Sequence, residues 1–196
     1  MDGDIVGSSA NRKNGGLPAG MTAGNFRING EDHAVVFASN HTLLEVVREE
    51  CQLPGTKHGC ELGECGACAV LLDGEPILSC LQLAVDALGR DIQTIEGLQD
   101  GNNLHPLQQA FADLGAAQCG YCTPGILMVA NALIDREPDP TDEQITEALS
   151  GNICRCTGYK RIVEGVKWAA ARQRGADWKP DEEYFTGTEI PVRDDS

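Results

Sequence analysis

The residues most able to do chemistry lie in one short run, Cys60-Glu-Leu-Gly-Glu-Cys65-Gly-Ala-Cys68. Its cysteines follow a C-x4-C-x2-C pattern, and its glycines let the backbone curl so that thiolates and amide N–H groups face one centre. Such a loop is typical of a [2Fe–2S] cluster, which takes four thiolate ligands. The run itself supplies only three of them.

The fourth cysteine is predicted from turn geometry. Two short apolar segments, 69–72 and 75–79, flank Asp73-Gly74, and Asp-Gly between apolar runs favours a tight β-hairpin. Folding that hairpin returns the chain to its start. We therefore expect Cys80 to lie beside Cys68 and to complete a first set of four ligands.

A second set is predicted further along the chain, in two loops. Cys119 and Cys122 precede one apolar, helix-patterned segment, and Cys154 and Cys156 precede another. The N-terminus of a helix favours thiolates and anionic groups because its N–H groups carry partial positive charge. If the two loops pack side by side, these four cysteines converge on a second [2Fe–2S] centre.

The elements around these cysteines are expected to form two small domains. From residue 24, apolar runs at 26–28 and 34–37 joined by Asn29-Gly30 predict a hairpin, and Thr42-Leu-Leu-Glu45 predicts a capped helix. Residues 81–85 and 91–95 are further strand candidates. Together these elements predict an α+β domain over 24–99, followed by a polar linker over 100–104.

Beyond the linker the apolar period is helical, which predicts four helices over 105–172 in two pairs. They are expected to stop at Gly115, before Pro138 and at Gly151. Thr123 is the expected N-cap of the second helix, with Pro124 at its first position, and Thr157 is the expected cap of the fourth.

A structural zinc site is the main alternative for either set of cysteines. The glycine-bearing loop favours iron–sulfur for the first set, whereas the residues alone leave zinc and iron–sulfur about evenly matched for the second. Cys51 falls on the apolar face of the predicted helix with Leu44 and Val47, so we expect it to be a core residue. His58, the one histidine near a cysteine motif, is expected to be an exposed loop residue.

Composition limits the classes of partner and compartment. The 196 residues hold 30 acids against 15 Lys and Arg, a formal charge of −15, which argues against nucleic acid or an anionic membrane as the main partner. Neither a signal-peptide apolar core nor a membrane-spanning apolar run occurs. We therefore expect a cytoplasmic protein, in which clustered cysteines more often bind metal than pair as disulfides.

Four motifs in order carry a family resemblance. They are CELGECGAC followed by Cys80, TIEGL at 94–98, QCGYCTPG at 118–125 and GNICRCTGY at 151–159. Over residues 24–172 the chain resembles the small iron–sulfur subunit of the molybdenum hydroxylases, the xanthine oxidase family. The resemblance also favours iron–sulfur over zinc for the second set of cysteines.

The resemblance implies an N-terminal β-grasp domain of the plant-type ferredoxin kind and an all-α four-helix-bundle domain, each with one [2Fe–2S] cluster. It implies electron transfer from a molybdopterin centre on a large subunit, through both clusters, to FAD on a medium subunit, with no substrate site on this chain. The expected assembly is a heterotrimer or a dimer of heterotrimers. Gln118 and Cys156 are implied to contact the pterin, although Gln118 could instead satisfy loop backbone.

Two segments lie outside the resemblance: residues 1–23, expected to be a flexible leader, and the acidic tail over 173–196. The tail holds Trp178, Tyr184 and Phe185, and disordered tails are usually poor in aromatic residues. We expect the tail to dock on a partner subunit, the alternative being a frayed end. Two other functions remain open from the residues, a free-standing two-cluster ferredoxin and a zinc-stabilised adaptor.

Overall fold

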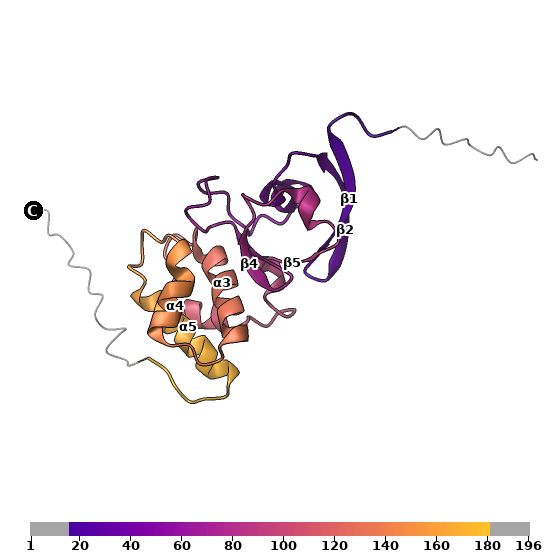
Figure 1. Ribbon diagram of the computed structural model, residues 1–196. Coiled ribbons are helices and arrows are strands. Elements are labelled where there is room, and N and C mark those ends of the chain that lie inside the picture. Colours follow the sequence, from indigo (N-terminus) through magenta and orange to yellow (C-terminus); the bar gives the residue numbers. More distant parts are fainter. Residues whose placement is uncertain (1–15, 181–196) are drawn as a thin grey trace, which may run out of the picture.

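The computed structural model describes residues 16–180. A sheet-containing half comes first along the chain and a helical half follows and lies beside it (Figure 1). The strands are β1 Met21–Ile28, β2 Glu31–Ala38, β3 Ala69–Leu72, β4 Glu75–Leu78 and β5 Asp91–Gln93. The longer helices are α2 Pro106–Leu114, α3 Thr123–Arg136, α4 Asp142–Ala148 and α5 Lys160–Gln173. The shorter helical pieces are α1 Leu43–Glu45 with η1 Val46–Glu50, η2 Ala84–Ala87, η3 Ile95–Gly97 and η4 Leu149–Gly151.

The five strands form one mixed sheet in the order β2-β1-β5-β3-β4. β1 pairs antiparallel with β2 and parallel with β5, while β3 pairs antiparallel with both β5 and β4. All four residues of β3 are buried, because this strand is covered on both faces. β3 therefore connects the core of the sheet to the helical half.

Both predicted hairpins are confirmed. Asn29-Gly30 and Asp73-Gly74 have positive φ at both positions (54° and 81°, 52° and 83°), as the turn that matches the twist of paired strands requires. The Asp73 carboxylate also accepts a hydrogen bond of 2.9 Å from the backbone N–H of Asp91. The second turn thus fixes β5 as well as joining β3 to β4.

The helical elements follow the predicted starts and stops with three corrections. The capping boxes at Thr42 and Thr141 are present, and Gly115 ends α2 in the left-handed conformation. However, α3 is capped by Cys122, with Thr123 already helical, and α5 begins after Tyr159, so neither Thr123 nor Thr157 is the cap. Neither Cys122 nor Tyr159 makes a side-chain cap hydrogen bond, so both helices begin without a hydroxyl cap.

The third correction concerns residues 81–85, which do not form a strand. They form a turn and part of η2, and only Leu83 makes an isolated bridge, to Thr42. Apolar residues at alternate positions suggested a strand, but here Ala84 and Ala87 fill the core as one turn of a 3-10 helix.

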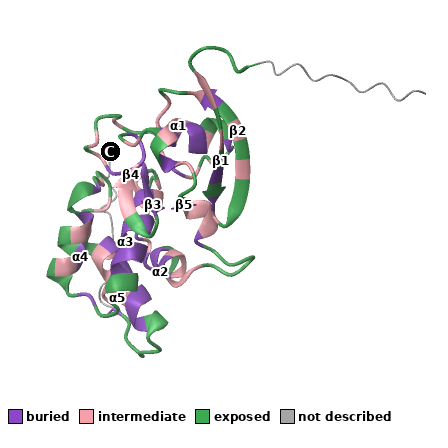
Figure 2. Ribbon diagram, turned by 45° about the vertical axis from the view of Figure 1, so that its right-hand side comes forward, coloured by how far each residue is buried: buried purple, intermediate pink, exposed green. Residues whose placement is uncertain are grey.

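The two largest apolar cores of the described residues lie one in each half, and α3 lies between the helical core and the sheet (Figure 2). One face of α3, including Ile126 and Ala130, packs in the helical core, and the opposite face packs on β3 through Met128 and Ala132 against Leu71. Residues 125–134 are buried throughout for this reason. The helical core includes Ala69 of β3, so the two halves share packing.

The ends of the two predicted domains differ in part from the structure. β1 begins at Met21, so residues 21–23 belong to the sheet and not to the leader. α5 includes Gln173, the first residue of the predicted tail. Beyond the helix, the centroid of the Trp178 ring lies 5.3 Å from the ammonium of Lys167 in α5. Residues 1–15 and 181–196, which hold the rest of the leader and most of the tail, lie outside the described residues. No helix in the described part is long and apolar enough to cross a membrane.

Candidate iron–sulfur sites

The first four predicted cysteines are brought together by the glycine loop and the β3–β4 hairpin. The backbone N–H of Cys65 acts to lower the pKa of Cys60, while Cys68 packs with Cys80 in one buried cluster and lies close enough to Cys65 for the two sulfurs to interact electrostatically. The predicted return of the chain is therefore confirmed: the backbone N–H of Ser79 donates to the carbonyl of Cys68 at 3.4 Å. Gly63 and Gly66, with φ of 77° and 70°, make the loop curl.

The electrostatic surroundings of this set favour thiolates at its exposed end. Backbone N–H groups of Leu62 and Glu64 donate to the Cys60 sulfur, each at 3.4 Å, and together with the N–H of Cys65 lower the pKa of Cys60 to about 6. Burial acts in the opposite direction on Cys68 and raises its pKa to about 11. A loop that aims amides at a sulfur also stabilises an anionic cluster bound there.

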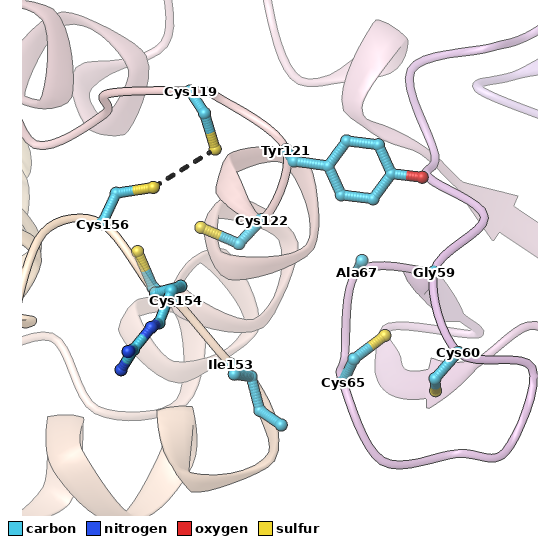
Figure 3. Close-up of a pocket in the computed structure, with 11 residues that line it drawn as sticks. Gly59, Cys60, Cys65, Ala67, Cys119, Tyr121, Cys122, Ile153, Cys154 and Cys156 are labelled. Carbon is cyan, nitrogen blue, oxygen red and sulfur yellow. Dashed lines mark hydrogen bonds between the residues drawn. The ribbon is translucent and has the colours of Figure 1, made fainter.

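The second four predicted cysteines also lie together, between the N-termini of α3 and α5 (Figure 3). The Cys156 thiol donates to the Cys119 sulfur at 3.5 Å, and the sulfurs of Cys122 and Cys154 lie near each other (Figure 3). The four sulfurs thus form two neighbouring pairs, each joining one loop to the other. The expected convergence of the two loops is confirmed.

The pKa values of this set differ with depth. Burial, followed by the hydrogen bond with Cys154, raises the pKa of Cys122 to about 12. Burial also acts to raise the pKa of Cys154, but hydrogen bonds from the side chain and N–H of Thr157 and the N–H of Cys156 leave it below the usual value. Cys154 is therefore the more readily ionised of this pair.

The two cysteine loops contact each other directly. The N–H of Ile153 donates to the carbonyl of Cys65 at 2.9 Å, and the buried side-chain amide of Asn152 donates to the carbonyl of Gly66 at 3.0 Å. The Tyr121 hydroxyl donates to the carbonyl of His58 at 2.6 Å. A cavity of about 360 Å³ lies between the two sets and is lined by cysteines of both (Figure 3).

Two glycines permit this close approach. A Cβ on Gly66 would lie 2.3 Å from the carbonyl oxygen of Gly151, and a Cβ on Gly125 would lie 2.3 Å from the carbonyl oxygen of Gly66. Any side chain at either position would push the loops apart. The sequence signalled Gly66 only as part of a metal loop.

Both donor sets fit an iron–sulfur cluster. Each supplies four cysteine sulfurs and no other ligand type, as a [2Fe–2S] cluster requires, and each has N–H or O–H donors aimed at sulfur. Across residues 16–180, no three Cys, His, Asp or Glu side chains are arranged to hold a single metal ion.

The remaining candidates lie as follows. Cys51 is a core residue, as expected, and burial raises its pKa to about 11. His58 is exposed, also as expected, and its Nε2 lies 3.0 Å from a carboxylate oxygen of Glu61. Gln118 and Cys156 are both exposed beside the second set.

Three residues with a role in the site were not predicted from the sequence: Asn152, Thr157 and Tyr159. The Tyr159 hydroxyl accepts the N–H of Cys154 at 2.7 Å and donates to the carbonyl of Asn152 at 2.8 Å. Thr157 lies 3.1 Å from the Cys154 sulfur. Their presence inside the GNICRCTGY motif was the only available signal, because their partners depend on how the loop folds.

Comparison with known proteins agrees with this geometry. Residues 26–95 match the family described as 2Fe-2S iron-sulfur cluster binding domain, and residues 94–167 match that described as [2Fe-2S] binding domain. The chain therefore consists of a ferredoxin-like [2Fe–2S] domain with a mixed sheet and a second, helical [2Fe–2S] domain.

Relatives identify the family. The chain is 48% identical over 148 residues to the nicotinate dehydrogenase small FeS subunit of Eubacterium barkeri, covering 76% of this chain and 94% of that one. It is 47% identical over 141 residues to the xanthine dehydrogenase iron-sulfur-binding subunit of Escherichia coli O157:H7, covering 71% and 88%. A chain of quinoline 2-oxidoreductase from Pseudomonas putida 86 superposes with a TM-score of 0.76 at 41% identity, covering 80% and 99%.

The protein belongs to the small iron–sulfur subunits of the molybdenum hydroxylases, the xanthine oxidase family. It is thus the iron–sulfur subunit of an oxidoreductase.

Proposed function

We propose that this chain is the cytoplasmic electron-transfer subunit of a heteromeric molybdenum hydroxylase. Electrons enter from a molybdopterin centre on a large subunit, pass through two [2Fe–2S] clusters and leave to FAD on a medium subunit. The expected assembly is a heterotrimer or a dimer of heterotrimers. The observation that carries this proposal is the Cys65 carbonyl to Ile153 N–H hydrogen bond, because it joins the loops of the two cysteine sets directly.

We assign all eight motif cysteines as ligands. They are Cys60, Cys65, Cys68 and Cys80 for the N-terminal cluster and Cys119, Cys122, Cys154 and Cys156 for the C-terminal cluster. Bound clusters supply one-electron redox chemistry, and the protein holds the sulfurs, directs N–H donors at them and fixes the distance between the sites. In the hydrogen bond between Ile153 and Cys65, the acceptor residue Cys65 is a ligand of the first cluster. The donor residue Ile153 is followed directly by Cys154, a ligand of the second cluster.

We infer that the N-terminal domain, residues 21–99, is a β-grasp of the plant-type ferredoxin kind. The helical domain, 105–173, is a four-helix bundle reached through the linker at 100–104. Pairing of the parallel β1 and β5 at the centre of a mixed sheet supports the first assignment. The four helices α2–α5 around one apolar core support the second.

Gln118 and Cys156 are proposed to contact the pterin of the large subunit. Both are exposed, and Cys156 lies on the side of the second set away from the first cysteine loop (Figure 3), so a partner can reach them without a change in the fold. In the assembled enzyme, Gln118→Ala is expected to slow reduction of the C-terminal cluster by substrate about tenfold or more, measured by stopped-flow absorption under anaerobic conditions. Reduction at the wild-type rate would remove this role.

The function is tested by purifying the tagged full chain from cells that also express its partner subunits. We expect about four iron atoms per chain, two [2Fe–2S] signals by electron paramagnetic resonance after reduction, and co-purifying molybdenum and flavin. Recovery of the two-cluster chain alone, without flavin or molybdenum, would favour the free-standing ferredoxin. Zinc in place of iron would favour the adaptor.

A further inference from the structure

The loop of the second cysteine set carries a hydroxyl directed at one of its sulfurs. Thr157 Oγ1 lies 3.1 Å from the sulfur of Cys154, and the same oxygen accepts the backbone N–H of Tyr159 at 3.2 Å. An amide N–H can only donate, so the oxygen uses a lone pair for Tyr159 and keeps its own proton for another partner. The Cys154 sulfur is the partner within reach.

The direction of this hydrogen bond is fixed further by the chemistry of a metal ligand. A cysteine that binds iron does so as a thiolate, which has no proton and can only accept. The Thr157 hydroxyl must then be the donor to Cys154. Hydrogen bonds to a ligand sulfur are among the protein's means of setting the potential of an iron–sulfur cluster.

We propose that Thr157 is a positioning residue. Its hydroxyl donates to the Cys154 thiolate and thereby raises the reduction potential of the C-terminal cluster. The inference rests on the proposed function in one respect, that Cys154 is a cluster ligand. Reduction adds negative charge to the cluster and its sulfurs, and a donated proton stabilises that charge. Loss of the hydroxyl should therefore make the cluster harder to reduce.

Other contacts of the loop hold the Thr157 hydroxyl close to the Cys154 sulfur. The Tyr159 hydroxyl accepts the Cys154 N–H and donates to the Asn152 carbonyl, so the Cys154 end of the segment is held by a contact without Thr157, whereas the backbone N–H of Tyr159 donates to Thr157 Oγ1. Asn152 is itself buried and hydrogen-bonded to the other cysteine loop. Thr157→Val is therefore expected to remove both the donor to Cys154 and the acceptor of the Tyr159 N–H, while the Tyr159 hydroxyl still holds Cys154.

The sulfur donors of the first set offer a contrast. Cys60 accepts from the backbone N–H groups of Leu62 and Glu64, which no side-chain substitution removes. The Thr157 contact comes from a side chain and can be changed alone. Evolution or design could adjust this one potential by exchanging the residue at position 157.

The test compares four variants in the assembled enzyme, one of which, Thr157→Ala, removes the hydroxyl and shortens the side chain. Thr157→Val removes the hydroxyl and keeps the shape, Thr157→Ser keeps the hydroxyl, and Thr146→Val is the matched control, since its hydroxyl donates to the backbone carbonyl of Asp142 and not to a sulfur. Redox titration followed by electron paramagnetic resonance gives the potential of each cluster separately. Iron content and melting temperature are measured on the same samples.

We expect Thr157→Val to lower the equilibrium constant for reducing the C-terminal cluster about tenfold, which corresponds to about 59 mV for one electron. Thr157→Ser and Thr146→Val should stay within about twofold of the wild type, and the N-terminal cluster should not change in any variant. A purely structural role would lower the melting temperature without this shift.

Three results would overturn the proposal. The first is an unchanged potential in Thr157→Val with both clusters intact, and the second is an equal shift in Thr157→Val and Thr157→Ser. The third is loss of the C-terminal cluster in both Thr157→Val and Thr157→Ala, which would show that the hydroxyl is needed for cluster assembly. Failure of the proposed function is distinguishable, because a wild-type enzyme without a second [2Fe–2S] signal would already show it.

Discussion

Cys51 and Cys65 both belong to the N-terminal half, but their sulfurs have different surroundings. Cys51 packs in the core of the sheet domain, where burial and the nearby Glu50 raise its pKa to about 11. Cys65 lies in the glycine loop beside Cys60, and its carbonyl accepts from the second cysteine loop. Only Cys65 has other cysteine sulfurs around it, and a cluster needs four thiolates that converge on one centre.

This contrast gives a prediction with an internal control. Cys51→Ala is expected to lower stability by about 1 kcal/mol, because it removes one buried atom, and to leave iron at about four per chain. Cys65→Ser is expected to lose about half of the iron and one of the two paramagnetic signals. Iron assay and spectroscopy on both variants make the comparison; loss of iron in Cys51→Ala would contradict it.

At the scale of elements, the start of α2 depends on a histidine. His105 is the N-cap, and its Nδ1 accepts the N–H of Leu107 at 3.3 Å. Burial lowers the pKa of His105, although Asp135 acts to raise it. Protonation would remove the acceptor and leave a charge in a half-buried position, so the neutral ring is the form that stabilises the helix.

The contribution of His105 to stability should therefore decrease as the pH falls. The unfolded chain binds a proton at His105 more readily than the folded one, so this contribution to stability is fully present above about pH 6.5 and is lost as the pH falls through the lower folded pKa. We expect the melting temperature to fall more in the wild type than in His105→Asn when the pH is lowered from 7.5 to 5.5. These pH values lie about one unit either side of the unperturbed pKa of histidine. Asparagine is also a good N-cap, so this variant keeps the cap without the titration. Equal slopes would contradict the prediction.

A second prediction at this scale concerns the contact between α3 and the first cysteine loop. Gly125→Ala would place a Cβ 2.3 Å from the carbonyl oxygen of Gly66, a backbone atom that cannot move aside cheaply. We expect a loss of stability of about 1–3 kcal/mol, as for other overpacked sites, together with weaker cluster retention.

Gly151→Ala is the matched control for Gly125→Ala. A Cβ there meets nothing within 4 Å, although the Gly151 carbonyl lies in the same interface. Its stability should change by less than about 0.5 kcal/mol. Chemical denaturation and bleaching of the visible absorption with time measure both variants, and equal behaviour would show that the close approach is unimportant.

At the scale of the whole molecule, the two halves are joined by packing and by hydrogen bonds at the same place. Met128 and Ala132 of α3 pack on Leu71, and a short distance along the same face the two cysteine loops are hydrogen-bonded. Packing of this kind fixes the relative position of the domains, since a shift of either would open a cavity and leave buried polar groups unpaired. A rigid pair of sites suits electron transfer between fixed centres.

The tail is also a whole-molecule feature. Trp178 packs over Lys167 of α5 and lines a cavity of about 190 Å³ with Pro140 and Ala171, so the first part of the tail returns to its own domain. The proposed docking on a partner subunit then rests on Tyr184 and Phe185. Deleting 181–196 is expected to leave both clusters and the melting temperature of the isolated chain unchanged while weakening its assembly with the partners at least about tenfold.

Size-exclusion chromatography and titration with the partner subunits measure this loss. Tyr184→Ser combined with Phe185→Ser tests the rings without changing the acidic charge, and should weaken assembly similarly. Normal assembly of both variants would show that the tail does not dock.

Sequence alone predicted the local features. Asn29-Gly30 and Asp73-Gly74 predicted both hairpins because few other residues tolerate two successive positive φ angles, and the second hairpin placed Cys80 beside Cys68. Gly115 predicted the end of α2 for the same reason. The helical period predicted the four helices within a few residues, since each has an apolar stripe of its own.

Only the tertiary structure decided which long-range partners these features meet. The period of α3 showed one buried stripe, but the burial of Met128 and Ala132 depends on β3 lying across the opposite face. The roles of Asn152 and Thr157 depend on carbonyl and sulfur atoms that the folded loops bring within hydrogen-bonding distance. Sequence specifies such contacts only through the whole fold, because backbone polar groups carry no residue-specific signal, whereas turns and amphipathic stripes are encoded by the residues that form them.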